Sequence, residues 1–514
     1  MKLKSVSEMT LKEKLGQLIL PGFHSTYYDD QIKTLIEDYK VGNVILFTRN
    51  FESAKQVREL TNKIHEEIIK NTGHIPFIAI DQEGGLVTRM MKDVTFAPGP
   101  MTASAAGGDS TYYTGRMLAE DMIRLGMNLN LAPSLDVNNN PNNPVINVRS
   151  YSDDPKVVAA LGKRFIEGSL EYGVLACAKH FPGHGDCEVD SHLGLPTITF
   201  DTARIHEIEM HPFIENINVP AIMSAHIMFP AYDSVPATLS KKILTGILRE
   251  ELGFKGLILT DCLEMKAIQD QYGTANGALK AVLAGADLCD ISHTLDFQLK
   301  ALFLLEEAVN DGRLPISVLD EKVERILKAK EATLPYLEKY FYNQEMKFSQ
   351  SNNQLAQEIV NKSLTLVKGN NVKPDQDTLI IAPVAMAKTI IEDEFDERNL
   401  AKVLNKELPQ LNVVELVQTN EFKEEILSKL NNFKNVVVFS YNAAVNPWQV
   451  AFINDVLKQT NATVISLKGP MDFNKYHNLN NYLCLYEYTP NSIRTVVEYF
   501  KGNILPEGKL TIKL

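Results

Sequence analysis

The residues best suited to chemistry lie in one stretch, 179 to 196, with the sequence KHFPGHGDCEVDSHLGLP. It follows VLACA, a short apolar run typical of a buried strand, and its proline and glycines exclude a regular helix or strand. His184 and Asp186 are two residues apart, so in an extended loop their side chains point to the same side. A carboxylate beside an imidazole orients the ring and raises its basicity, as a proton-transferring histidine requires. Asp190 and His192 continue the same titratable loop.

Two other interpretations of this stretch stay open from the residues alone. One is a solvated polar loop whose histidines hydrogen-bond to backbone carbonyls. The other is a metal site, because His, Asp and Glu are all ligands. The sequence has neither HExxH nor a paired CxxC, which disfavours a metal site, so we expect no metal and no other cofactor.

Length and charge restrict the class of protein. A chain of 514 residues exceeds one ordinary domain, so two or three are expected. Hydrophobic residues make up 45% and charged residues 23%, as in a globular protein that is not embedded in a membrane. The net charge of −12 repels phosphate backbones, so nucleic acid is not an expected partner.

The cysteines and the apolar runs indicate a compartment. The five cysteines are scattered and form no CxxC, which favours reduced thiols over a disulfide framework. Charges interrupt the first fifteen residues, so no signal-peptide core is predicted. No apolar run approaches the roughly 20 residues that a membrane helix needs. We therefore predict a cytoplasmic protein, without a membrane partner and with no indication of its oligomeric state.

The first two thirds of the chain alternate short apolar runs with longer amphipathic ones. About eight strands are expected, nearly all followed by helices, which predicts a parallel sheet closed into a (β/α)₈ TIM-like barrel. The strands are expected at 17–22, 43–47, 76–81, 128–137, 174–180, 221–229, 257–261 and 288–292.

Polar residues end these runs, and in a barrel those ends converge on one face, where active sites of this architecture lie. The alternative is that strand ends are polar because they meet water, but that does not explain why Lys, His and Asp prevail over turn residues. The residues concerned are Asp81, Asp136, Lys179 with His180, His226 and Asp261.

From about residue 350 a second series of strands and helices predicts a smaller three-layer α/β sandwich. It has no GxGxxG and no P-loop, so nothing indicates nucleotide binding. The expected domains are a catalytic barrel over 1–335, a packed connector over 336–352 and the sandwich over 353–514.

Three further segments belong with the opening loop. They are DQEGGLVTR at 81–89, NLNLAPSLDVNNNPNNPVINVRS at 128–150, and GLILTDCLEM at 256–265. Asp261 lies at the tip of a buried strand, where a carboxylate is a candidate nucleophile. With KHFPGHGD and DSH, these motifs make the chain resemble the family 3 glycoside hydrolases, most closely their β-N-acetylglucosaminidase (β-hexosaminidase) branch, over residues 8 to 335 and more loosely to the carboxyl terminus.

The resemblance implies a retaining glycoside hydrolase on a (β/α)₈ barrel. By matched position, Asp261 would be the nucleophile, and His184 would be the general acid/base, supported by Asp186 on a mobile loop. The first sugar subsite would be formed by Asp81, Arg89, Arg149, Lys179 and His180. The implied substrate is a GlcNAc-containing oligosaccharide or a cell-wall muropeptide, and a cytoplasmic location would imply recycling of imported fragments.

Departures and alternatives accompany the resemblance. Leu86 stands where the family usually has Arg, with little effect expected, because Arg89 is the matched sugar ligand. Cys187 and Cys262 follow Asp186 and the nucleophile, and are interpreted as small packing residues rather than redox sensors. A β-glucosidase or a glycoside phosphorylase of the same family is the alternative activity, and a non-catalytic sugar-binding protein is the alternative class.

Overall fold

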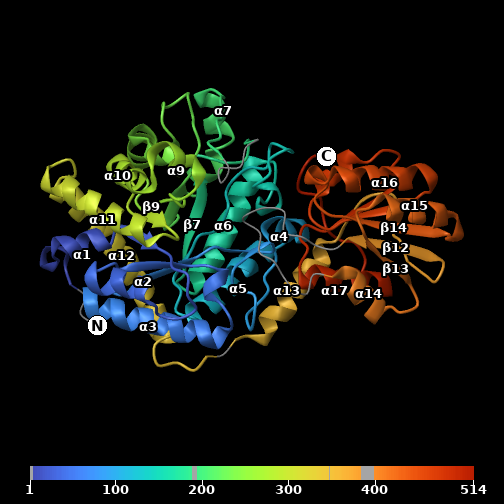
Figure 1. Cartoon of the computed structure of the whole chain (residues 1–514), viewed down its shortest axis with the longest axis horizontal. Coiled ribbons are helices and arrows are strands. Elements are labelled where there is room, and N and C mark those ends of the chain that lie inside the picture. The colour runs from blue at the N-terminus through green and yellow to red at the C-terminus, as the bar shows by residue number, and fades with distance from the viewer. Residues whose placement is uncertain (1–3, 188–193, 347, 384–398) are drawn as a thin grey trace.

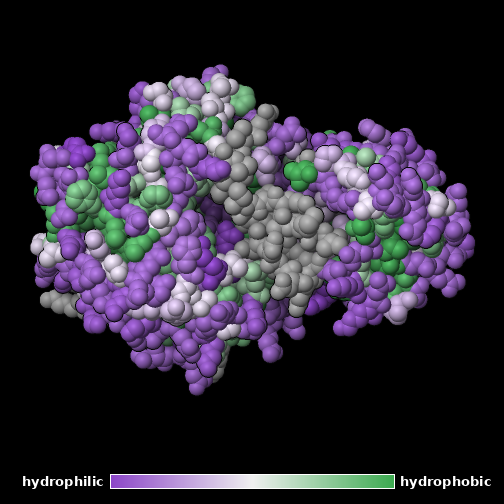
Figure 2. Space-filling model, in the orientation of Figure 1, coloured by the Kyte–Doolittle hydropathy of each residue, from purple (hydrophilic) through white to green (hydrophobic). Residues whose placement is uncertain are grey.

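The computed structural model describes residues 4–187, 194–346, 348–383 and 399–514. Asp190 and His192, which the sequence placed in the chemical loop, lie outside the described residues. The chain forms two units side by side, with helices α4 (Pro100–Ala106), α13 (Gln350–Ser363) and α17 (Pro490–Lys501) between them (Figure 1). The visible face of both units is mostly hydrophilic, with hydrophobic residues in smaller groups (Figure 2).

The first unit is a barrel of parallel strands. Six strands pair in the order β2-β3-β6-β7-β8-β9, and β1 pairs with β10. The bridge Leu259–Leu288 joins β9 to β10, and the Asn43 side chain donates hydrogen bonds to the Gln17 and Ile19 carbonyls between β2 and β1. The strands are β1 (Ile19–Pro21), β2 (Asn43–Leu46), β3 (Phe77–Ile80), β6 (Leu129–Asn130), β7 (Leu175–Phe181), β8 (Ala221–Ser224), β9 (Leu257–Thr260) and β10 (Cys289–Ile291).

Helices follow most strands and cover the barrel, because each apolar stripe packs on the buried strands. Local sequence fixes their ends: the Ser53 hydroxyl caps the start of α3, and Gly73, with φ 77°, ends it. The main helices are α1 (Leu11–Gly16), α3 (Ala54–Thr72), α5 (Ser110–Arg124), α6 (Pro155–Glu171), α9 (Lys266–Tyr272), α10 (Thr274–Ala284), α11 (Leu295–Asn310) and α12 (Ile316–Tyr340). Shorter ones are α2 (Asp30–Lys33), α7 (Thr202–Glu207) and α8 (His211–Glu215).

Two expected elements differ in detail. The strand expected over 128–137 is regular only over Leu129–Asn130, because Pro133 has no N–H to donate, although Leu135 N still donates to the Lys179 carbonyl. The helix expected after the strand at 221–229 is a π-helix over Lys242–Glu251. All eight predicted strands are otherwise present at their expected places, so the barrel is confirmed.

The second unit is a six-stranded sheet between two helical layers, as the sequence predicted. Its order is β11-β16-β15-β14-β12-β13, parallel except for β11. Helices α14 (Leu400–Glu407) and α17 cover one face, and α15 (Asn420–Lys429) and α16 (Pro447–Gln459) the other. The strands are β11 (Thr365–Lys368), β12 (Thr378–Pro383), β13 (Asn412–Leu416), β14 (Asn435–Ser440), β15 (Thr463–Ser466) and β16 (Asn481–Cys484).

The boundary between the units lies in helical structure. Helix α12 continues past residue 335 to Tyr340, and α13 begins at Gln350, inside the expected connector. Over the described part of the chain, every helix is too short or too polar to cross a membrane.

Candidate active site

A cavity of about 540 Å³ lies at the carboxyl ends of the barrel strands. It brings together seven of the eight site residues predicted from the sequence. These are Asp81, Arg89, Arg149, Lys179, His180, His184 and Asp261. Asp186 is the eighth, and it does not line the cavity.

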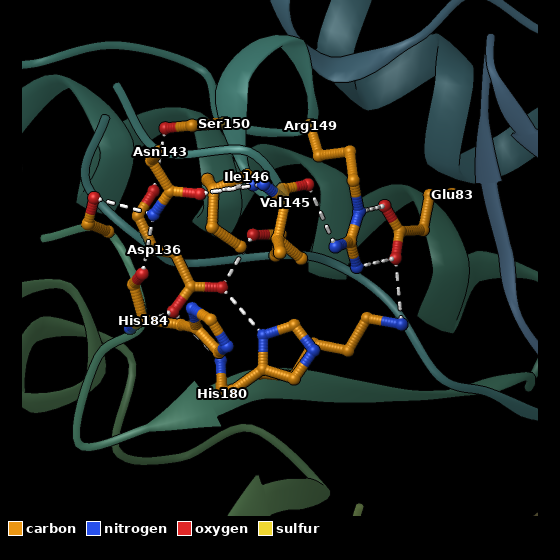
Figure 3. Close-up of polar contacts among 12 residues, drawn as sticks. Glu83, Asp136, Asn143, Val145, Ile146, Arg149, Ser150, His180 and His184 are labelled. Atoms are coloured by element: carbon orange, nitrogen blue, oxygen red, sulfur yellow. Dashed lines mark hydrogen bonds and ion pairs between the residues drawn. The ribbon is translucent and has the colours of Figure 1, made fainter. Parts of the chain in front are cut away.

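Lys179 and Arg149 converge on Glu83, a buried carboxylate of the short hairpin formed by β4 (Gln82–Gly84) and β5 (Val87–Thr88). Arg149 binds Glu83 through two hydrogen bonds of 2.7 and 2.9 Å (Figure 3). Lys179 Nζ lies 2.8 Å from Glu83 Oε1 and 2.7 Å from Asp81 Oδ1, and Arg89 Nη2 lies 3.9 Å from Asp81 Oδ2. The two carboxylates and three cations thus form one network in the cavity wall.

Burial alone would raise the pKa of Glu83, but Arg149 and Lys179 hold it well below its usual range. Burial would likewise lower the pKa of Arg149 and Lys179, but Glu83 raises the former, and Asp81 and Glu83 raise the latter. Glu83, Arg149 and Lys179 are therefore charged near neutral pH. Rigid charged donors and acceptors suit a hydroxyl-rich ligand that must be held in one orientation.

A second buried carboxylate, Asp136, anchors the histidine loop. Its Oδ2 accepts a hydrogen bond of 2.7 Å from His180 Nδ1, and its Oδ1 accepts one of 2.6 Å from the His184 backbone N (Figure 3). Burial would raise its pKa, but His180 and then His184 hold it below the usual range. Asn143 adds hydrogen bonds of 2.9 and 2.8 Å to the carbonyls of His184 and Gly185. The loop after β7 is thus attached to the segment after β6.

The His184 ring is buried, and its centroid lies 5.6 Å from that of His180. Burial, followed by the charge of His180, lowers the pKa of His184 to about 4. The ring is therefore neutral in this structure near pH 7. Asp186 contacts other residues of the described chain: its Oδ1 accepts from Asn140 at 3.0 Å, and Arg204 Nη2 lies 3.7 Å from its Oδ2. The dyad expected from the two-residue spacing stays a prediction.

Asp261 follows β9 and lines the cavity. Its Oδ1 accepts a hydrogen bond of 2.7 Å from the backbone N of Cys262. His226, which the sequence placed at a strand end, is buried behind this turn, and its Nε2 lies 3.0 Å from the Cys262 carbonyl. It supports the turn that carries Asp261.

Sequence reasoning left several cavity residues out. Glu83 stood inside the quoted DQEGG motif. Two cations, Arg149 and Lys179, were predicted for the same site and need an anion between them, which could have indicated Glu83. Asp290 lies within β10 and Ser292 directly follows it, and neither was predicted as a site residue. Leu86, the departure from the family pattern, is 4% exposed and packs with the sandwich core, away from the cavity.

Two cysteines, Cys187 and Cys262, lie near the site. Cys187 is buried and Cys262 lines the cavity, and burial raises the pKa of both thiols, so both stay protonated. Among the residues that the structure describes, no three His, Cys, Asp or Glu side chains are grouped so as to hold a metal ion.

Known proteins resemble the chain along most of its length. The model of the glycosyl hydrolase family 3 N terminal domain matches residues 10–329. A curated relative, beta-hexosaminidase A of Pseudoalteromonas piscicida, is 33% identical over 383 residues, which are 69% of this chain and 64% of that protein, just under two thirds of its length. A beta-hexosaminidase of Photobacterium profundum is 34% identical over 52% of this chain and 80% of its own.

The solved structures agree. A glycoside hydrolase family 3 β-N-acetylglucosaminidase from a Paenibacillus species superposes with a TM-score of 0.91 at 36% identity, over 98% of this chain and 99% of its own. A β-glucoside phosphorylase superposes with a TM-score of 0.82 at 24% identity, over 99% of this chain and 94% of its own, which shows the shared fold. The resemblance that the sequence motifs indicated is thereby confirmed, together with the class of enzyme, the glycoside hydrolases. The chain belongs to glycosyl hydrolase family 3.

Proposed function

We propose that this chain is a retaining β-N-acetylglucosaminidase, which removes terminal β-linked N-acetylglucosamine from cell-wall muropeptides or other oligosaccharides. The observation that carries the proposal is that Asp261 and His184, which follow different strands, line the same cavity. Retention needs a carboxylate nucleophile on one side of the sugar and a proton donor on the other.

In the first step, the Asp261 carboxylate would attack the anomeric carbon while protonated His184 gives its proton to the leaving oxygen. The bond to the leaving group breaks and a glycosyl–Asp261 ester forms. In the second step, His184 takes a proton from water, whose oxygen attacks the anomeric carbon and releases Asp261. Two inversions give net retention.

Asp81, Arg89, Arg149, Lys179 and His180 would hold the sugar in the first subsite. Glu83 and Asp136 fix three of these side chains before a ligand arrives, so little ordering remains to be paid for on binding. The names of the relatives, beta-hexosaminidases and a β-N-acetylglucosaminidase, support an acetamido sugar as the substrate. Cytoplasmic recycling of imported fragments is part of this proposal.

A glycoside phosphorylase is the second candidate function, and the neutral His184 ring supports it. A neutral imidazole places less negative charge beside the anomeric carbon than a carboxylate would, so phosphate could attack the glycosyl–enzyme in place of water. The substrate of a β-glucosidase differs from an N-acetylglucosaminide only in the group at carbon 2 of the sugar. A purely sugar-binding protein is disfavoured because both Asp261 and His184 are present in the cavity.

The test is a panel of aryl β-glycosides assayed with and without phosphate. We expect a higher kcat/KM on the N-acetylglucosaminide than on the glucoside, and release of free sugar whether or not phosphate is present. Equal or better turnover of the glucoside contradicts the acetamido preference. A glycosyl phosphate product assigns the chain to the phosphorylases.

A further inference from the structure

One acid in the cavity wall, Asp290, has no part in the proposed mechanism. It lies in β10, where it pairs with Leu20 of β1, and only 4% of it is exposed. It lines the same cavity as Asp261 and Asp81. A buried acid on the wall of a cavity needs a hydrogen-bond partner, and its contacts indicate which one.

The position of Asp290 is fixed from three directions. Its backbone N donates to Thr260 Oγ1 at 3.0 Å, and its carbonyl accepts from Leu263 N at 3.0 Å. The Ser292 hydroxyl donates to its Oδ1 at 2.6 Å, and Arg49 Nη2 in turn binds the Ser292 carbonyl at 2.8 Å. The side chain is therefore preorganised before any ligand binds.

The surroundings of Asp290 favour a carboxylic acid over a carboxylate. Among the ion pairs of the described residues, none includes it. The acids Asp261, Asp81 and Glu264 surround it, and Arg49 is a cation near enough to interact with its charge. Carboxylates that share a site cannot all ionise. Burial, opposed by the Ser292 hydrogen bond and reinforced by the neighbouring acids, raises the pKa of Asp290 well above its usual value. With one oxygen occupied by Ser292, the other carries an O–H donor.

The order of the strands places this donor relative to the sugar. Going round the barrel from Asp261 to Asp81, one arc passes β8, β7 and β6 and carries Lys179 and His180. The other arc passes β10, β1 and β2 and carries Asp290 and Arg49, whose guanidinium donates to the carbonyls of Phe23 and Ser292. A sugar with its anomeric carbon at Asp261 presents one edge to each arc. The arc richer in donors suits the edge with the 2-acetamido and 3-hydroxyl groups, so the edge with the hydroxymethyl group faces Asp290.

Resting on the proposed function, we propose that Asp290 is a specificity-determining residue that hydrogen-bonds the 6-hydroxyl group of the bound sugar. A buried donor left without its partner costs a substrate on the order of 10- to 100-fold in kcat/KM. The enzyme should therefore discriminate against a sugar that lacks only this hydroxyl.

The experiment combines a substrate deletion with a side-chain deletion. Wild type, Asp290→Asn and Asp290→Leu are assayed on an aryl β-N-acetylglucosaminide and on its 6-deoxy analogue. We expect wild type to prefer the parent by at least tenfold, and Asp290→Leu to abolish that preference by losing activity only on the parent. Asp290→Asn, which keeps an N–H donor, should retain most of it. Glu264→Gln is the matched control, because its carboxylate lines the same cavity but binds the backbone N of His293.

Three results overturn the proposal: a wild-type preference near one, an equal loss on both substrates in Asp290→Leu, or the same selective loss in Glu264→Gln. The wild-type ratio decides even if the leucine variant does not fold. If wild type hydrolyses only glucosides, the proposed acetamido preference fails, yet the glucoside and its 6-deoxy analogue still test Asp290.

Discussion

At the scale of single residues, Glu83 carries more of the site than its exposure suggests. It is only 1% exposed, yet it lines the cavity, and Arg149 and Lys179 both bind it. Removing one member of a buried charged group costs about 3–5 kcal/mol, because the others are left unpaired. The positions of Arg149 and Lys179, which we propose bind the sugar, are thus set by Glu83.

Asp261 is expected to form the covalent intermediate, because it is the carboxylate at the tip of β9 inside the cavity. Asp261→Asn should lower kcat by several orders of magnitude with the thermal unfolding curve unchanged. Incubation with a slow 2-fluoro sugar, followed by digestion and mass spectrometry, should find the adduct on the peptide that contains Asp261. A label on Asp81 or Asp290 instead would refute the assignment.

His184 should make the stability of the protein depend on pH. Its native pKa, about 4, lies below the value of about 6.5 for an unfolded chain. Between these values the unfolded state binds a proton that the native state does not, so stability present above pH 6.5 is lost as the pH falls towards 4. The loss from this group should be about 2 kcal/mol at pH 5.

Urea unfolding at pH 7 and pH 5 measures this loss. His184→Gln should reduce the difference between the two pH values by about 2 kcal/mol. His184→Gln should not abolish the whole stability difference, because burial also lowers the pKa of His65 to about 4. His65→Gln is therefore a positive control for the method. The same pH difference in wild type and His184→Gln would show that His184 is not buried as a neutral ring in solution.

At the scale of elements, the glycines of the loop after β7 serve close packing in this conformation. A Cβ on Gly185 would lie 1.7 Å from the Val137 carbonyl oxygen, and one on Gly183 would lie 2.7 Å from Glu209 Cβ. The family resemblance implied that this loop is mobile. In the structure the glycines allow the loop to approach the segment after β6, where Asp136 and Asn143 bind it.

The proposed dyad needs Asp186 to leave Asn140 and Arg204 and approach the His184 ring when sugar is bound. A carboxylate there would raise the histidine pKa from about 4 towards neutrality, as an acid catalyst requires. Asp186→Ala should then cost nearly as much activity as His184→Ala, and the double variant little more. The losses should be larger on a disaccharide than on an activated aryl glycoside, which needs less protonation.

Asn140→Ala is the control for this experiment, because it removes one of the two groups that hold Asp186 in the present conformation and leaves the Asp186 carboxylate in place. It should leave activity on the disaccharide within about threefold of wild type, or raise it. Additive losses in the two single variants, or equal losses on both substrates, would mean that His184 is not the acid and that Asp186 does not orient it.

At the scale of the whole molecule, the sequence predicted the barrel because apolar runs and helix patterns are local. It predicted Asp81, Lys179 and Asp261 because a strand end is recognisable from the run before it. The supporting contacts were not predictable in the same way. Glu83 with Arg149, and Asp136 with His180, are separated by 66 and 44 residues, so their pairing depends on how distant loops meet. The boundary expected at 335 falls on Pro335, a residue that usually ends or bends a helix, but α12 runs through it to Tyr340.

The sandwich also reaches the site through packing. Leu86 of the β4–β5 hairpin belongs to the same apolar cluster as the sandwich core. Gly85 N donates to the Ala97 carbonyl at 2.9 Å, which ties the hairpin to the segment before α4. Glu487 of the sandwich accepts hydrogen bonds from Gly99 N in that segment at 2.7 Å and from Thr102 Oγ1 in α4 at 2.6 Å. The hairpin that presents Glu83 to the cavity is thus held from outside the barrel.

Glu487→Gln should therefore weaken sugar binding from a distance. The amide keeps the shape but loses the charge that strengthens these two buried hydrogen bonds, at a cost of about 1.5–3 kcal/mol in the free energy of unfolding. We expect KM on the aryl N-acetylglucosaminide to rise several-fold while kcat changes less, because the hairpin carries binding groups. Asp153→Asn is the control: its carboxylate accepts from Lys513 N at 2.8 Å elsewhere between the units, so KM should not change. An unchanged KM in Glu487→Gln would show that the sandwich stabilises the barrel without positioning its sugar-binding hairpin.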